Sequence, residues 1–163
     1  MYKRQDMRIL SDAISHTHPE ARLIVQDQLS VIETAKSQNM PSHIELTPHD
    51  FFSPQPIKGP RAYFLHSILH DWLDTPAAQI LTHLISAGEP GYTKILLLEA
   101  IMPDRVKDMP HRLAAMDVNM MLHHSALERT EKQWRALIEA AGLTFGRVWR
   151  VEGQWQGFIE VEM

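Results

Sequence analysis

The sequence contains no cysteine, and none of its seven glycines precedes Gly59. The lack of cysteine excludes disulfides, thiolate metal sites and cysteine nucleophiles, and it fits a reducing compartment. No apolar run approaches the roughly 20 residues that span a bilayer. The start of the chain, Met1–Asp6, is polar and lacks the apolar segment of a signal peptide. We therefore expect a soluble cytoplasmic protein that has no membrane partner.

Charge of one sign is not concentrated anywhere in the chain, whose net charge is −4 and which has no basic stripe. Nucleic acid is therefore excluded as an expected partner. The ten histidines are numerous but scattered. His66 and His70 have the spacing of two metal ligands on a helix, but His66 lies in a predicted strand. His123 and His124 would point to opposite sides of a helix, so no metal site is predicted.

Short β-rich runs alternate with stretches of helical apolar spacing along the chain. Capping boxes are expected at the starts of two helices, Ser30 with Glu33 and Thr130 with Gln133. The last two strands predict a hairpin with Gly153 in its turn. The order indicates one α/β domain with an open, mostly parallel sheet. The predicted helices cover residues 6–16, 30–38, 74–85, 113–123 and 130–141, and the predicted strands cover residues 21–27, 44–50, 61–68, 94–100, 143–151 and 154–162.

Polar residues follow several predicted strands at their carboxyl ends, where ligands bind in open α/β sheets. They are Asp27, Asp50, the segment 66–72 and Glu99. A carboxylate in such a place can accept hydrogen bonds from a ribose or an amine. Asp27 or Asp50 taken alone is explained more simply as a cap of the following turn. Because both occur together with His70 and Glu99, we favour a binding site.

His70 and Glu99 form a chemically sensible acid–base pair. A neutral imidazole accepts a proton through one nitrogen, while a carboxylate holds the other N–H and supports the imidazolium. Glu128 is a second carboxylate that could share this role, although by itself it is explained as an acid before a helix N-terminus. Met120 lies at helical spacing from Met116, which indicates either core packing or a substrate pocket.

Four segments resemble class I S-adenosylmethionine-dependent O-methyltransferases of the caffeate and flavonoid type, and especially their fungal relatives in polyketide pathways. The first reads Tyr-Phe-Leu-His-Ser-Ile-Leu-His-Asp-Trp, with the His-Asp-Trp motif at its end. The second, His-Asp-Phe-Phe, resembles the family's Gly-Asp-Met-Phe turn. The last two carry Leu-Glu-Ala-Ile-Met-Pro and Glu-Arg-Thr-Glu-Lys-Gln-Trp. These segments are residues 63–72, 49–52, 98–103 and 128–134.

The resemblance implies roles for three residues in catalysis. His70 would deprotonate the acceptor hydroxyl, and Glu99 and Glu128 would support the histidine. The acceptor would be a phenolic hydroxyl of a small secondary metabolite. The resemblance places the substrate near Asp71, Trp72, Met120 and His124.

The cofactor implied by the resemblance is S-adenosyl-L-methionine. Asp27 would hold the ribose hydroxyls, and Asp50 and Phe51 would flank the adenine. The family has a lysine at the position of His66, near the adenine, so His66 is the corresponding candidate in this chain.

The family's first strand and its Gly-x-Gly-x-Gly loop have no counterpart in the sequence, and neither has its preceding helical dimerisation domain. The expected fold is therefore a class I methyltransferase-like (Rossmann-like) sheet that lacks its first strand and ends in an antiparallel hairpin. Residues 6–163 are interpreted as the C-terminal part of a catalytic domain, and residues 1–5 as a non-native leader. The parent enzyme would form a homodimer through the absent domain. The alternative is an authentic short protein.

Two other functions stay open at this point. A non-catalytic methyltransferase-like binding or interaction module agrees with the missing glycine loop. A different α/β enzyme, such as a hydrolase that uses His70, is disfavoured because the sequence has no Gly-x-Ser-x-Gly nucleophile elbow.

Overall fold

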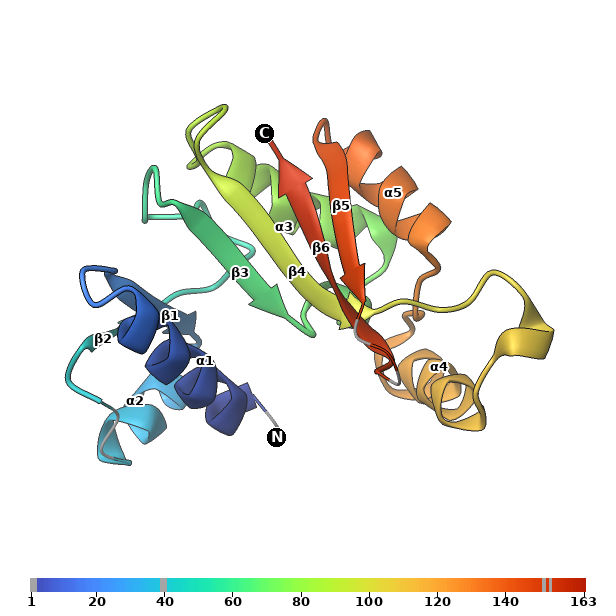
Figure 1. The fold of residues 1–163 in the computed structure, drawn as a ribbon, viewed down its shortest axis with the longest axis horizontal. Helices are drawn as coiled ribbons and strands as arrows, with labels where there is room; N and C mark the ends of the chain where they lie inside the picture. The colour runs from blue at the N-terminus through green and yellow to red at the C-terminus, as the bar shows by residue number, and fades with distance from the viewer. Residues whose placement is uncertain (1–2, 39–40, 151, 153) are drawn as a thin grey trace. The chain divides into compact units, whose positions relative to one another are not determined.

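The computed structural model describes residues 3–38, 41–150, 152 and 154–163 (Figure 1). The chain divides into two compact units, of which unit 1 ends at Ser53 and unit 2 is Pro54–Met163. Part of the predicted leader (Met1 and Tyr2), the predicted strand end Val151 and the predicted turn glycine Gly153 lie outside the described residues. No helix within the described ranges is long and apolar enough to cross a membrane.

Unit 1 consists of α1 (Lys3–Thr17), β1 (Leu23–Asp27), α2 (Leu29–Ser37) and β2 (Ile44–Pro48). The two strands pair in parallel, with Leu23 opposite Ile44 and Asp27 opposite Pro48. Helix α2 packs against both strands and buries Ile32 and Ala35. Because the strands are parallel, their carboxyl ends meet at one edge of this small sheet. Asp27 ends β1 there, and Asp50 follows β2.

The capping box predicted for Ser30 and Glu33 is wrong. Helix α2 begins at Leu29, its N-cap is Gln28, and no side chain caps it. The chain enters the helix directly after β1, so Ser30 already lies within the first turn. The Asp27 carboxylate instead accepts a hydrogen bond from the backbone N–H of Gln28, at 2.8 Å.

Unit 2 is built on a four-stranded sheet in the order β3-β4-β6-β5, made of Ala62–His66, Lys94–Ala100, Gln156–Glu162 and Thr144–Arg150. β3 and β4 are parallel, and β6 is antiparallel to both of its neighbours. The predicted hairpin is confirmed, with β6 rather than β5 joined to the rest of the sheet. β6 alternates buried Ile159 and Val161 with partly exposed residues, whereas β5 carries exposed charged residues such as Arg147 and Arg150. Charges of that kind suit an edge strand.

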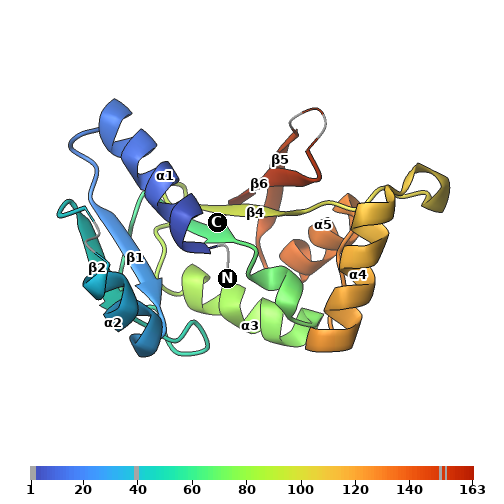
Figure 2. The same ribbon diagram turned by 90° about the horizontal axis from the view of Figure 1, so that it is seen from below.

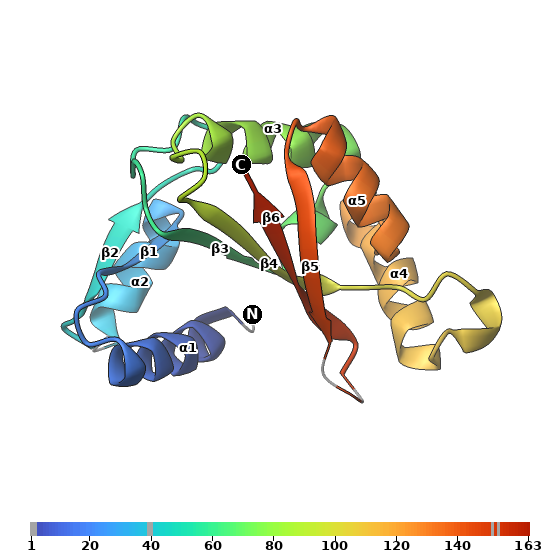
Figure 3. The same ribbon diagram turned by 45° about the horizontal axis from the view of Figure 1, so that its top comes forward.

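The remaining elements of unit 2 are the single turns η1 (Leu69–Asp71) and η2 (Val106–Asp108) and the helices α3 (Asp74–Ile85), α4 (His111–His124) and α5 (Glu131–Ala140). α3 and α5 cover the same face of the sheet (Figures 1 and 2). α5 also lies beside β5 (Figure 3). The core between these layers contains Ile80, Leu81, Ile95, Leu97, Trp134, Ile138, Ile159 and Val161, all at most 1% exposed.

The described strands leave β1 and β3 each paired on one side only. β1 pairs with β2, and β3 pairs with β4. This pairing agrees with the predicted α/β sheet that lacks its first strand.

The capping box predicted at Thr130 is confirmed, since the Gln133 N–H donates to Oγ1 of Thr130 at 3.3 Å and the Thr130 N–H donates to Oε1 of Gln133 at 2.8 Å. We expect Thr130→Ala to lower the free energy of unfolding of unit 2 by about 1 kcal/mol, because the first turn of α5 loses its cap. Urea unfolding followed by tryptophan fluorescence measures this, since all four tryptophans lie in unit 2.

Thr75→Ala is the matched control, because Thr75 is exposed near the start of α3, whose N-cap is Leu73. Its effect should stay within about 0.5 kcal/mol. Equal losses in the two variants would contradict a specific role for the Thr130 cap.

Candidate active site

A left-handed residue ends β3 and redirects the chain into the η1 turn. Ser67 has a φ of 50°, a conformation that costs a residue with a Cβ on the order of 1 kcal/mol. Its N–H donates to the Leu98 carbonyl at 3.0 Å, and its hydroxyl accepts from Gln156 Nε2 at 3.1 Å. Both partners lie on neighbouring strands, so the sheet itself holds this conformation. The chain then enters η1, which carries His70.

Glu99 occupies a core position of β4. Ile95, Leu97 and Glu99 alternate along one face of the strand, and all three have no solvent-exposed surface. Burial raises the pKa of Glu99 to about 7, although the nearby His70 and two backbone N–H groups act in the opposite direction. Those N–H groups belong to Ile68 and Leu69, and both donate to Oε1 of Glu99 at 2.9 Å.

Glu99 therefore holds the backbone of the turn that carries His70. Its other oxygen, Oε2, is buried and has no hydrogen-bond partner within the described part of the chain. An unpaired buried oxygen costs less when the carboxyl is neutral than when it is ionised. The raised pKa of Glu99 is consistent with this environment.

Glu128 is the carboxylate that contacts the ring of His70. Its Oε1 lies 3.0 Å from Nδ1 of His70, and its side chain is fully buried. The ring N–H that was predicted to pair with Glu99 lies next to Glu128, the second carboxylate named for this role. Glu99 accepts hydrogen bonds from the backbone of the turn, whereas Glu128 contacts the ring.

The segment that follows α4 positions Glu128 next to the ring of His70. Ser125 ends α4 in the left-handed region, with a φ of 51°. The backbone N–H of Glu128 then donates to Oδ1 of Asp117 at 2.9 Å. The Met102 N–H donates to the Arg129 carbonyl at 2.9 Å, which fastens the segment beside the end of β4.

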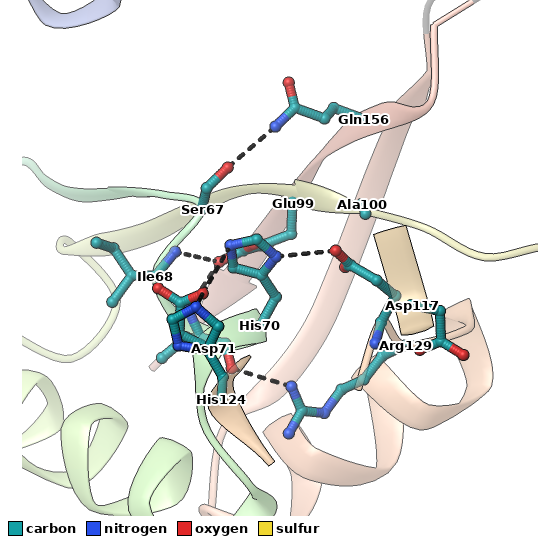
Figure 4. Close-up of polar contacts among 12 residues, drawn as sticks. Ser67, Ile68, His70, Asp71, Glu99, Ala100, Asp117, His124, Arg129 and Gln156 are labelled. Atoms are coloured by element: carbon teal, nitrogen blue, oxygen red, sulfur yellow. Dashed lines mark hydrogen bonds and ion pairs between the residues drawn. The ribbon is translucent and has the colours of Figure 1, made fainter. Parts of the chain in front are cut away.

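A carboxylate is only an acceptor, so the contact with Glu128 places the hydrogen of a neutral His70 on Nδ1. The other ring nitrogen, Nε2, then carries the lone pair that can take a proton. Asp71 Oδ1 lies 3.3 Å from this Nε2 and 3.8 Å from Nε2 of His124 (Figure 4). His70 therefore lies between two carboxylates. The buried Glu128 faces Nδ1, and the partly exposed Asp71 faces Nε2.

The pKa of His70 is the result of opposing influences. Burial lowers it, whereas the hydrogen bond to Glu128 and the charges of Glu99, Glu128 and Asp71 raise it. The balance leaves the pKa of His70 above its ordinary value of 6.5. An imidazole that is more basic than usual is better suited to accept a proton.

One face of α4 turns toward this cluster. Asp117, Met120 and His124 follow one another at i, i+3 and i+7, which is one side of a helix. Asp117 holds the backbone of Glu128, Met120 is 8% exposed, and His124 approaches Asp71. Trp72 ends the η1 turn, where its N–H donates to the Leu69 carbonyl at 3.2 Å. Of the predicted substrate residues, Asp71 and His124 thus lie beside His70.

Three of the four predicted cofactor residues belong to unit 1. Asp27 Oδ1 accepts from the Gln28 N–H at 2.8 Å, and Asp50 Oδ1 accepts from the Phe52 N–H at 3.0 Å. The local turn contacts expected for these carboxylates are therefore present. A carboxylate has about four acceptor sites, so one backbone contact leaves it able to bind a ligand.

The other two cofactor candidates lie close to polar or aromatic neighbours. The ring of Phe51 meets that of Phe52 edge to face, with centroids 5.0 Å apart. His66 belongs to unit 2, ends β3, and has its Nε2 3.4 Å from Gln156 Nε2.

Two residues that support the cluster were not predicted from the sequence. Asp117 lies in none of the predicted motifs, and Arg129 lies in the segment 128–134, to which no role for the arginine was assigned. Arg129 is 1% exposed and bonds the backbone of the η1 turn. An arginine is normally exposed, and neither apolar periodicity nor a strand end marks this one as buried.

Comparisons with known proteins agree with the expected family. A family model described as an O-methyltransferase domain matches residues 9–144. The O-methyltransferase mfmE of Annulohypoxylon moriforme is 40% identical over 148 residues, which are 90% of this chain and 36% of that protein. The demethylsterigmatocystin 6-O-methyltransferase stcP of Emericella nidulans is 37% identical over 142 residues, 87% of this chain and 67% of that protein. The chain thus spans about a third of the length of mfmE and about two thirds of that of stcP.

Solved structures of similar fold include enzymes with bound cofactor or analogue. OxaC in complex with sinefungin and meleagrin is 30% identical, with a TM-score of 0.86 over 96% of this chain and 40% of that chain. LepI in complex with SAM is 27% identical, with a TM-score of 0.85 over 95% of this chain and 40% of that chain. A structure described as a pericyclic reaction enzyme has the same identity, TM-score and coverage as LepI.

We expect Glu128→Gln to lower the pKa of His70, because the variant removes a negative charge that stabilises the imidazolium. The remaining influence of burial acts in the same downward direction. An NMR titration of the His70 ring signals measures the change.

Glu131→Gln is the control, since Glu131 pairs with the exposed Arg150 at 2.9 Å rather than with His70. The pKa of His70 should stay unchanged in that variant. An unchanged pKa in Glu128→Gln as well would refute the Glu128 contact as the source of the raised value.

Proposed function

The chain belongs to the O-methyltransferase domain family, and we propose that it carries the catalytic base of an enzyme that methylates a phenolic hydroxyl of a small secondary metabolite. The observation that carries the proposal is the buried 3.0 Å contact between His70 Nδ1 and Glu128 Oε1. It leaves Nε2 as the proton acceptor. Glu99 and Glu128 serve as the residues that support His70, one through the turn and the other through the ring.

In this proposal His70 would remove the hydroxyl proton while the oxygen bonds to the sulfonium methyl carbon of S-adenosyl-L-methionine, whose carbon–sulfur bond would break and leave S-adenosylhomocysteine. A free phenol has a pKa of about 10 and an imidazole about 6.5, so complete proton transfer in advance costs roughly 5 kcal/mol. The raised pKa of His70 narrows this gap. Proton removal is therefore coupled to attack, and positioning of the hydroxyl at Nε2 supplies much of the remaining acceleration.

The acceptor hydroxyl would bind beside Nε2 of His70 and donate its proton to that nitrogen. Asp71, whose Oδ1 lies 3.3 Å from Nε2, would stabilise the imidazolium that forms, and His124 lies on its other side. The apolar side chains of Trp72 and Met120 would contact the aromatic ring of the substrate. Because Asp71 and His124 have side chains 24% and 42% exposed, this side of His70 is partly exposed to solvent and could admit a ligand.

S-adenosyl-L-methionine supplies an electrophilic sulfonium methyl group when it is bound. The residues of unit 1 fit its ribose, because Asp27 and Asp50 place two carboxylates at one edge of a parallel sheet. Carboxylates there are suited to accept hydrogen bonds from ribose hydroxyls. Phe51 is the proposed contact of the adenine in unit 1, and the cofactor role of His66 stays a prediction.

The second candidate is a non-catalytic methyltransferase-like module. The observation that favours it is the absence of glycine before Gly59, because a glycine-rich loop lets the backbone approach a cofactor closely. The similarity to a pericyclic reaction enzyme also shows that this fold is compatible with chemistry other than methyl transfer. The homodimer expected of the whole enzyme stays a prediction.

We expect His70→Gln to lower the rate of methyl transfer from S-adenosylmethionine to phenolic acceptors by about 10²- to 10⁴-fold, the usual contribution of a general base. The dissociation constant for S-adenosylhomocysteine should not change, since His70 acts on the acceptor. Product formation followed by mass spectrometry and binding followed by calorimetry give the two quantities.

The exposed His111→Gln variant is the control and should retain both properties. Binding of S-adenosylhomocysteine without methyl transfer by the unsubstituted chain would favour the non-catalytic module. A folded chain that binds no S-adenosylhomocysteine would contradict the proposed function altogether.

A further inference from the structure

Arg129 is a buried cation whose side-chain hydrogen bonds and ion pair reach the segment 69–74 around His70. It is 1% exposed, whereas arginine is almost never fully buried unless its charge is paired. Its Nη2 lies 2.7 Å from Oδ1 of Asp74, whose side chain is 74% exposed. Its guanidinium carbon lies 5.0 Å from the centre of the Trp134 ring. The cation is thus paired on one side and packed against an aromatic ring on another.

Nε of Arg129 also donates to Oδ1 of Asp74, at 3.1 Å, whereas Nη1 and Nη2 bind backbone carbonyls on both sides of His70. Nη1 donates to the Leu69 carbonyl at 3.0 Å, and Nη2 donates to the Trp72 carbonyl at 2.8 Å. The Leu69 carbonyl also accepts from the Trp72 N–H at 3.2 Å, so the guanidinium adds a second hydrogen bond to it. By binding the Trp72 carbonyl as well, the guanidinium fixes the spacing between the residues before and after His70 and Asp71.

The same short segment therefore holds His70 in two ways. Glu128 contacts the ring of His70, and its neighbour Arg129 holds the backbone that carries the ring. Trp134, on which Arg129 packs, donates its indole N–H to the Ala100 carbonyl at 2.9 Å, next to Glu99. A displacement of the Arg129 guanidinium would move the turn relative to Glu128, and the ring contact depends on that distance.

We propose that Arg129 is a positioning residue, which fixes the η1 turn so that Nδ1 of His70 meets Glu128. Its importance for catalysis rests on the proposed function, but its effect on His70 does not. A lysine cannot replace it, because an ammonium is a point donor that lacks the planar fork needed to bind Leu69, Trp72 and Asp74 together.

The test compares Arg129→Lys with the unsubstituted chain, without cofactor or substrate. We expect Arg129→Lys to remain folded, to lose the downfield Nδ1–H NMR signal of His70 and to show a lower pKa of His70. Burial would then act on a ring that no longer has its hydrogen bond to Glu128. Arg135→Lys is the control, because Arg135 also packs over an aromatic ring, that of Phe145 at 4.1 Å, but makes its ion pair with Glu139.

Asp74→Asn is a second variant that alters only the exposed partner of the guanidinium. It should shift the pKa of His70 in the same direction by a smaller amount, and it decides the matter if Arg129→Lys does not fold. A folded Arg129→Lys, or failing that Asp74→Asn, whose His70 signal and pKa match the unsubstituted chain would overturn the inference. Because no methyl transfer is measured, this result is independent of whether the chain is a methyltransferase.

Discussion

The hydrogen bond between His70 Nδ1 and Glu128 Oε1 is the interaction on which the proposed chemistry depends. It joins residues 58 positions apart in the sequence, so the folding of unit 2 must bring two separate segments together. Two left-handed serines, Ser67 and Ser125, direct those segments toward each other. Backbone strain of this kind often occurs at functional sites, where surrounding contacts hold it in place. The bond sets which ring nitrogen is free to accept a proton.

The cluster concentrates negative charge in the core, which costs free energy unless that charge is compensated. Glu99 and Glu128 are both buried and each has one oxygen without a partner among the described residues. Two pKa values are raised by this placement. The raised pKa of Glu99 favours its neutral form, and the raised pKa of His70 favours its cation. Arg129 adds a permanent positive charge at the turn. The site is therefore balanced electrostatically by groups that also determine its geometry.

Much of the fold and part of the candidate site could be predicted from the sequence. Apolar periodicity located the strand Lys94–Ala100, and the capping box at Thr130 marked the start of α5. The capping box at Ser30 failed because the same pattern also occurs inside a first turn. The choice between Glu99 and Glu128 as the ring partner could not be made from spacing, because it depends on the path of the backbone after Ser67 and Ser125. The role of Arg129 could not be predicted, because its burial depends on tertiary contacts that no local sequence pattern indicates.

The central claim is that Glu128 fixes the tautomer of His70 so that Nε2 is the base. Two-bond ¹H–¹⁵N correlation NMR of the neutral imidazole, recorded on the unsubstituted chain above the pKa of His70, observes this directly. The account predicts a protonated Nδ1 and an unprotonated Nε2. A neutral ring that carries its proton on Nε2 would contradict it, because the nitrogen assigned as the base would then have no lone pair to offer.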